Sequence, residues 1–146
     1  MDTAAASPEV LAYPLVARGL TPDSTVVEVR GWRICDGFFG LVAGPCIVET
    51  REQTLETLDL SAVPVLRRET HLPVVLDPSH AAGRSELVLP LARAAVAAGA
   101  DGVIVEVHPR PEDALCDGPQ LIRVGEFARF ADEIRTLVAL MGKTVG

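Results

Sequence analysis

Four side chains that commonly bind metal ions follow apolar runs in this 146-residue sequence. Cys46 comes shortly after one run, His80 after a second, Glu106 lies near the end of a third, and Asp117 lies in the loop beyond it. A thiolate, an imidazole and two carboxylates make a complete ligand set for a divalent transition metal. Their mixture of soft and hard donors suits Mn²⁺, Fe²⁺, Co²⁺ or Zn²⁺ without choosing among them. Such an ion acts as a Lewis acid or activates a bound water molecule.

The elements that must position these residues alternate between strands and helices. The apolar runs, which have the composition of buried parallel strands, are Phe39–Ala43, Leu72–Leu76 and Gly102–Val107. The helical patterns are Thr50–Gln53 as a helix start, Ala62–Glu69, Ser85–Ala98 and Val124–Met141. This alternation predicts an α/β fold with parallel strands. The carboxyl ends of such strands form the functional edge, so the four side chains are expected to converge there.

Each of the four residues also has a purely structural interpretation. Cys46 alone could be a small buried core residue, and His80 could simply hydrogen-bond its own turn. Asp117 precedes Gly-Pro and has the features of a turn residue. Glu106 is harder to explain in this way, because a buried carboxylate without a partner is costly. The metal hypothesis therefore depends on all four residues lying at matching strand ends.

Four further residues are candidates for supporting roles. His108 lies two positions after Glu106, on the same strand face if the strand continues, and is a candidate general base. The alternative for His108 is a solvated loop residue. Arg84 and Arg110 are candidates to bind a substrate carboxylate. Asp77 could orient a metal ligand from behind.

Composition excludes several classes of function. Acidic residues outnumber basic ones 20 to 13 and only 4% of residues are aromatic, so we expect no nucleic-acid partner. No apolar run reaches the roughly 18 residues of a membrane span, and the first residues lack the pattern of a signal peptide. With three scattered cysteines, these features predict a reduced, cytoplasmic protein without a membrane partner. The only lysine is Lys143, near the end of a tail, which argues against a Schiff-base aldolase.

Long motifs carry a resemblance to a known family. GPCIVET at Gly44–Thr50 resembles the GPC-x-VES signature of the type I 3-deoxy-7-phosphoheptulonate (DAHP) synthases, a family that includes KDO8P synthase. The segment Thr57–Gln120, with DPSHAAGR, VEVHP and DGPQ, is similar to the C-terminal part of those enzymes. Asp36–Phe39 also matches, and the resemblance covers roughly residues 25–140.

The resemblance implies a fold, a reaction and a cofactor. The family fold is a (β/α)₈ barrel, and the family reaction condenses phosphoenolpyruvate with erythrose 4-phosphate. The family's divalent metal is held by residues that match Cys46, His80, Glu106 and Asp117. The metal polarises the aldehyde or positions a water molecule. We therefore expect a divalent transition metal as cofactor.

One departure from the family pattern is large. Only 33 residues separate Cys46 from His80, whereas in the family this interval holds barrel strands two to six. Its KPRTS-like segment and lysine-containing strand, which bind phosphoenolpyruvate, have no counterpart here. We therefore predict a partial TIM-type β/α barrel, about half of one, with parallel strands equivalent to barrel strands 7-8-1 in that order. It would comprise residues 25–146, beginning with a short N-terminal hairpin (25–39) that follows an arm (1–24).

A partial barrel would leave both outer strands without partners. Exposed apolar edges favour association, so we expect a homo-oligomer, dimer or higher, formed through open sheet edges and helix 85–98. That helix is apolar almost all round, with only Glu86 and Arg93 charged. Its many alanines, which expose little area, are the alternative explanation. The N-terminal hairpin could cover one open edge.

These features predict a repurposed metal-dependent enzyme acting on a small-molecule substrate. Plausible chemistries are aldol-type bond formation or cleavage, cyclisation, dehydration or hydrolysis, in specialised metabolism, on an oxygen-rich or carboxylate substrate. DAHP synthase activity itself is not expected, because the phosphate-binding motifs are absent. The alternative is a non-catalytic partner or regulatory subunit of a full-length DAHP synthase or another pathway enzyme. A barrel shortened deliberately, to study half-barrels, is a third interpretation, which the specific N-terminal arm argues against.

Overall fold

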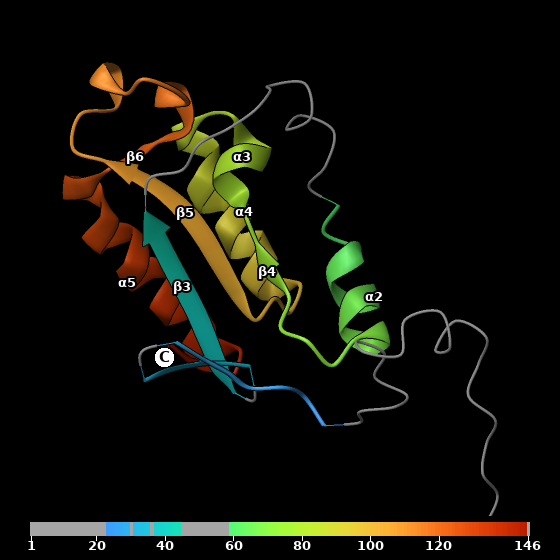
Figure 1. Ribbon diagram of the computed structural model, residues 1–146. Coiled ribbons are helices and arrows are strands. Elements are labelled where there is room, and N and C mark those ends of the chain that lie inside the picture. Colours follow the sequence, from blue (N-terminus) through green and yellow to red (C-terminus); the bar gives the residue numbers. More distant parts are fainter. Residues whose placement is uncertain (1–22, 30, 36, 45–58, 146) are drawn as a thin grey trace, which may run out of the picture.

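The computed structural model describes residues 23–29, 31–35, 37–44 and 59–145 (Figure 1). Cys46, the expected helix start at Thr50–Gln53 and nearly all of the expected arm (1–24) lie outside these ranges. The elements in chain order are β1 (Val27–Val29), β2 (Trp32–Ile34), β3 (Phe38–Gly44), α2 (Ala62–Glu69), β4 (Val75–Leu76), α3 (Pro78–Ala82), α4 (Ser85–Ala97), β5 (Gly102–His108), two 3₁₀ turns, η1 (Pro111–Asp113) and η2 (Gly118–Gln120), β6 (Ile122–Arg123), α5 (Val124–Leu140) and β7 (Thr144–Val145).

Parallel strands form the main sheet, in the order β4-β5-β3-β7. β5 is central, with Val103 opposite Leu41 of β3 and Gly102 opposite Val75 of β4. β6 extends the pairing at the far end of β5, where Ile122 lies opposite Val107. The structure thus confirms the predicted α/β class, the parallel direction and the neighbour order of the three predicted strands.

A glycine allows the two longest strands to pair closely. A Cβ atom at Gly102 would lie 2.6 Å from the carbonyl oxygen of Gly40, which is closer than side-chain carbons approach backbone. Any larger residue at this position would push β5 away from β3. The pairing matters for the site, because β5 presents Glu106 at its far end.

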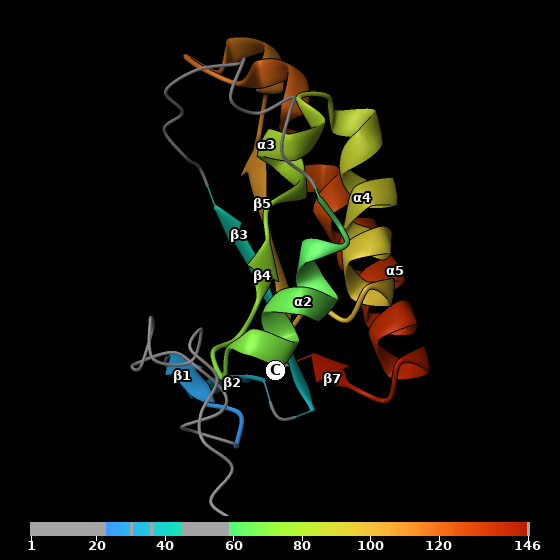
Figure 2. The same cartoon turned by 90° about the vertical axis from the view of Figure 1, so that its right-hand side faces the viewer.

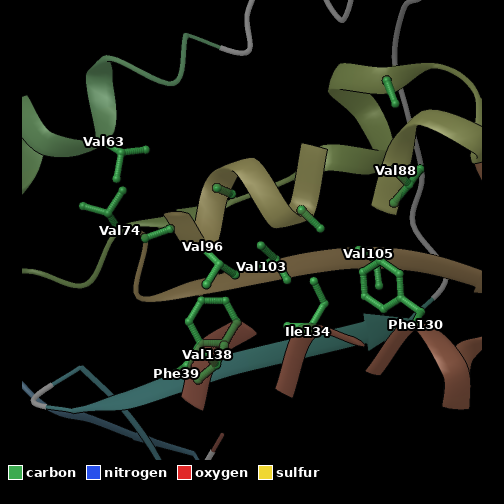
Figure 3. Packing of buried hydrophobic residues seen from close by; sticks show 14 of the residues in the cluster. Phe39, Val63, Val74, Val88, Val96, Val103, Val105, Phe130, Ile134 and Val138 are labelled. Carbon is green, nitrogen blue, oxygen red and sulfur yellow. The ribbon is translucent and has the colours of Figure 1, made fainter. Parts of the chain in front are cut away.

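The hydrophobic core lies between one face of the sheet and the helices α4 and α5 (Figure 3). Val103 and Val105 alternate along β5 and are fully buried against these helices. The helices contribute fully buried side chains at Val88, Ala92, Ala95, Ile134 and Val138. Burying a large aliphatic side chain stabilises the folded state by about 1.5–3 kcal/mol, so this layer fixes the position of β5.

The opposite face of the sheet is more open. Figure 2 shows the sheet nearly edge on, with α4 and α5 on the same side of it. Side chains that alternate with the core positions remain exposed, Val75 at 42% and Ile104 at 39%. In a closed barrel such residues would point inward. Neither α4 nor α5 packs on this face (Figure 2).

The C-terminal residues do not form a loose tail. Thr144 and Val145 form β7, which pairs with Phe38 and Phe39 on the outer side of β3. Lys143 is largely buried, with Nζ 3.1 Å from Oδ1 of Asp101 and 2.9 Å from the carbonyl oxygen of Ala100. The expectation that both outer strands lose their partners is therefore wrong for the amino end of β3.

The N-terminal hairpin forms as predicted, but it does not extend the main sheet. β1 and β2 pair antiparallel as a separate two-stranded sheet, with Val27 opposite Ile34. Ile34 packs within 3.0 Å of the position that a Cβ atom at Gly40 would occupy. The hairpin therefore packs near the start of β3 and pairs with neither edge of the main sheet, while β7 pairs with the outer side of β3.

The predicted strand Leu72–Leu76 is shorter than expected. Only Val75 and Leu76 form β4, and the backbone of Val74, just before it, bonds to Asp101. The N–H of Val74 donates to Oδ2 of Asp101 at 3.1 Å, and its carbonyl accepts from the N–H of Asp101 at 2.8 Å. Asp101, whose side chain also accepts from Arg67, therefore joins the start of β5 to the residue that precedes β4.

Helix α4 begins and ends close to the predicted positions, and part of its outer surface is apolar. Leu87 is 43% exposed and Pro90 is also exposed, while Val88 and Ala92 are buried. No helix in the described ranges is long and apolar enough to cross a membrane.

Candidate metal site at the carboxyl edge of the sheet

His80 lies on α3, a one-turn helix that begins directly after β4. Pro78 occupies its first position, where a missing N–H costs nothing, and Asp77 caps it. Oδ1 of Asp77 accepts the backbone N–H of His80 at 3.1 Å, and Oδ2 lies 2.5 Å from His80 Nδ1. Because a carboxylate only accepts, Nδ1 carries the proton, and in the neutral ring Nε2 presents a lone pair.

Glu106 lies near the end of β5, with its side chain on the face opposite the helices. It is 2% exposed, and its backbone N–H donates to Oγ of Ser79 at 3.0 Å. Oε2 accepts from Nε2 of Gln120 at 2.6 Å. Oε1 lies 3.5 Å from His80 Nε2 and forms no hydrogen bond with any part of the chain that the structure describes. A buried oxygen of Glu106 therefore faces Nε2 of His80, and neither a hydrogen bond nor another described donor satisfies that oxygen.

Asp117 lies at the start of the turn η2, which contacts α3. Its φ of 57° is left-handed, a conformation that Asp adopts more readily than most residues. Gly118 follows because a Cβ atom there would lie 2.6 Å from the carbonyl oxygen of Pro111. Oδ2 of Asp117 is also buried without a hydrogen-bond partner within the described ranges.

An ion pair joins the loop that carries η1 to the residue that precedes α5. Glu112 forms a 2.9 Å ion pair with Arg123 of β6. A hydrogen bond from its own backbone N–H and the bond from Arg123 hold the pKa of Glu112 below its ordinary value. Since both side chains of this pair are exposed, the contact positions the loop more than it stabilises the fold.

The polar atoms at this edge suit a divalent cation only in part. Two buried carboxylate oxygens without a donor, and an imidazole nitrogen held in one tautomer, are the ligands that such an ion requires. In the described ranges, however, no group of three His, Cys, Asp or Glu side chains is arranged to hold a metal. His80 and Glu106 are brought together, Asp117 lies on the adjoining turn, and Cys46 falls outside those ranges.

The supporting candidates occupy different positions. Asp77 contacts the His80 ring, which is the contact that an orienting role requires. β5 continues to His108, whose Nδ1 accepts the backbone N–H of Arg110 at 3.1 Å. Arg110 and Arg84 are both exposed, with Arg110 2.8 Å from Asp113. Arg84 lies 3.7 Å from Glu86.

Two residues at this edge were not singled out from the sequence. Ser79 is fully buried and accepts the backbone N–H of Glu106, which ties α3 to β5. Gln120 is 6% exposed and donates to Glu106. Both stand beside predicted ligands, Ser79 before His80 and Gln120 three positions after Asp117. That adjacency was the available signal, since neither residue is part of a periodic pattern.

The structure defines an α/β protein with a parallel sheet, in which His80 and Glu106 lie together where the strands end. The family model described as the DAHP synthetase I family matches residues 51–141, and the chain belongs to that family. A phospho-2-dehydro-3-deoxyheptonate aldolase of Thermotoga maritima is 52% identical over 92 residues, which are 63% of this chain and 27% of that protein. A 2-dehydro-3-deoxyphosphooctonate aldolase of Desulfosudis oleivorans is 45% identical over 73 residues, 42% of this chain and 26% of that protein.

Solved structures extend the likeness to the fold. The crystal structure of the Thermotoga maritima DAHP synthase superposes with a TM-score of 0.82 at 25% identity, over 90% of this chain and 78% of that one. A truncated form of the same organism's synthase gives the same TM-score over 92% of this chain and 100% of that one. The α/β fold therefore resembles the DAHP synthase barrel, while the chain spans only about a quarter of the curated relatives that it matches.

Proposed function

We propose that this protein binds a divalent transition metal with Cys46, His80, Glu106 and Asp117. The observation that supports this most directly is the pair of buried carboxylate oxygens, Glu106 Oε1 and Asp117 Oδ2, with no donor within the described ranges. Buried polar groups are normally satisfied, and two exceptions on adjoining elements favour a common cation. Cys46 would come from the segment that directly follows β3, the strand paired with β5.

The protein's own residues would prepare this site before the ion arrives. Asp77 holds the proton of His80 on Nδ1, so that Nε2 is free to coordinate. His108, at the end of β5, would act as general base, while Arg84 and Arg110 would bind a substrate carboxylate. When bound, the metal would supply Lewis-acid polarisation of a carbonyl group or activation of water.

We further propose that the substrate is a small oxygen-rich or carboxylate-bearing molecule, and that the reaction is aldol-type, a cyclisation or a dehydration. The relatives' names, both aldolases, support carbon–carbon bond chemistry. The short interval between Cys46 and His80 supports loss of the phosphoenolpyruvate and erythrose 4-phosphate sites. The only lysine, Lys143, is bonded to Asp101 at the amino end of β5, about 16 Å along the strand from Glu106. Specialised metabolism is the setting that this combination favours.

Metal analysis of the purified protein tests the first proposal. We expect one Mn²⁺, Fe²⁺, Co²⁺ or Zn²⁺ per chain, lost in Cys46→Ala and in His80→Ala. A protein that takes up none of the four ions would refute it. Turnover of a panel of keto acids and aldehydes, abolished by the same substitutions, is the expected result for an enzyme. Bound metal without turnover in that panel would favour the non-catalytic partner instead.

We also propose that the protein self-associates through the sheet edge at β4 and the sheet face that α4 and α5 leave open (Figure 2). Val75 and Ile104 are exposed there, and Leu87 and Pro90 expose an apolar surface on α4. Apolar strands without cover favour association. Light scattering is expected to give a dimer or larger species, and Ile104→Lys should shift it toward monomer. A monodisperse 15.5 kDa species at micromolar concentration would refute the proposal.

A further inference from the structure

Gln120 makes a close hydrogen bond to the side chain of Glu106. Its Nε2 lies 2.6 Å from Glu106 Oε2, and both side chains are almost completely buried. The orientation of the amide is unambiguous here, because only its nitrogen can donate to a carboxylate. A hydrogen bond to a charged group in a buried environment is stronger than one between neutral groups. The bond therefore restricts rotation of the Glu106 carboxylate.

We propose that Gln120 is a positioning residue that aims Glu106 at the metal, an inference that rests on the metal site proposed above. With Oε2 bound to the amide, Oε1 is the oxygen left facing His80 Nε2 at 3.5 Å. Without that bond, the carboxylate could rotate and present either oxygen. Gln120 thus holds Oε2 of Glu106 in a hydrogen bond and leaves Oε1 available to bind the ion.

The same residue also closes the turn that presents Asp117. The backbone N–H of Gln120 donates to the carbonyl oxygen of Asp117 at 3.0 Å, which makes the 3₁₀ turn η2. The side chain of Gln120 then reaches across to β5. Through its backbone and its side chain, this single residue links the two carboxylates whose oxygens lack donors in the described structure.

The chemistry of an amide suits this position better than that of other donors. An Arg or Lys would donate equally well, but its positive charge would neutralise Glu106 and repel a cation. A Gln donates without changing the charge at the site. An Asn is one methylene shorter and would fall short of Glu106 from the same backbone position. A Glu would place a second acceptor against Oε2.

The test compares Mn²⁺ binding to the full chain and its variants, measured from the EPR signal of free Mn²⁺. Gln120→Met keeps the length and removes the donor, and Gln120→Asn shortens it. Lys143→Met is the matched control, since it removes a buried donor at the other end of β5. We expect the Kd for Mn²⁺ to rise about 10–100-fold in both Gln120 variants and to stay within twofold in the control. Urea unfolding without metal is expected to show that all three variants lose stability.

A second readout separates positioning from general stability. The visible spectrum of the Co²⁺-loaded protein is expected to change in the Gln120 variants and to match wild type in Lys143→Met. Wild-type affinity in Gln120→Met would overturn the inference while leaving the metal site in place. If Gln120→Met fails to fold, wild-type affinity in Gln120→Asn would overturn it equally. A wild-type protein that binds neither Mn²⁺ nor Co²⁺ would overturn the proposed function and this inference together.

Discussion

Replacing Glu106 with Gln is expected to stabilise the metal-free protein. In the folded state one oxygen of this carboxylate is bonded to Gln120, and the other lacks a donor in the described structure, at 2% exposure. Glu106→Gln keeps the shape and the acceptor that faces Gln120. Its new NH₂ group would take the place of Oε1 and donate toward His80 Nε2. The substitution therefore removes a buried charge and pairs an atom that had no partner.

The magnitude follows from the cost of an unsatisfied buried group. That cost is about 1–3 kcal/mol, so the free energy of unfolding in EDTA should rise by a similar amount. For a chain of this length the change corresponds to roughly 2–4 °C in Tm for each kcal/mol. Glu28→Gln, an exposed site on β1, is the matched control and is expected to change stability by no more than about 0.5 kcal/mol.

The assay is urea unfolding followed by circular dichroism, with EDTA and then with excess Mn²⁺. At a metal concentration of one hundred times Kd, wild type should gain about 2.7 kcal/mol, and Glu106→Gln should gain much less. The variant is thus more stable than wild type without metal and less responsive with it. A variant less stable than wild type in EDTA would show that Oε1 has a partner in the folded protein, and would refute the reasoning.

Three further predictions concern neighbouring parts of the structure. Asp77→Ala removes the hydrogen bond that orients the His80 ring and the cap of α3. The affinity for Mn²⁺, measured by EPR, should therefore fall about 10–100-fold. Unchanged affinity would contradict the orienting role of Asp77. Ile134→Ala leaves a cavity in a fully buried layer and should lower the free energy of unfolding by about 2–5 kcal/mol. The urea midpoint should fall while the slope of the transition stays unchanged. A loss below about 1 kcal/mol would mean that the core collapses to fill the cavity. The pKa of Glu112 is lowered in the folded protein, so its contribution to stability is present above its unfolded pKa and lost as pH falls through the folded value. Arg123→Ala should raise that pKa in an NMR titration, and a pKa that does not move would show that the backbone bond alone sets it.

The long elements of this fold could be predicted from the sequence because periodicity and burial agree in them. Val103 and Val105 alternate with polar or exposed positions, and Ile134 and Val138 repeat at helical spacing. The two-residue strands β6 and β7 could not be predicted, since two residues carry no period. Lys143 was expected in a tail, whereas the structure bonds it to Asp101. Local pattern could not show this contact, because Asp101 is distant in sequence.

The candidate site was predictable in its residue types but not in its hydrogen bonds. Motif and strand-end position indicated His80, Glu106 and Asp117, and the structure places the first two 3.5 Å apart. The bond from Gln120 depends on how the loop after β5 folds back, which local pattern does not specify. The position of Cys46 relative to the other three residues stays a prediction.

The register of the sheet has a consequence for the order in which the protein folds. Val75 and its partner Gly102 are 27 positions apart in sequence, whereas Leu41 and its partner Val103 are 62 apart. Contacts between near neighbours form before distant ones, because closing a longer loop costs more entropy. We therefore expect β4, α4 and β5 to assemble first, with His80 and Glu106 already adjacent. β3 then docks as a late strand, after His80 and Glu106 have come together.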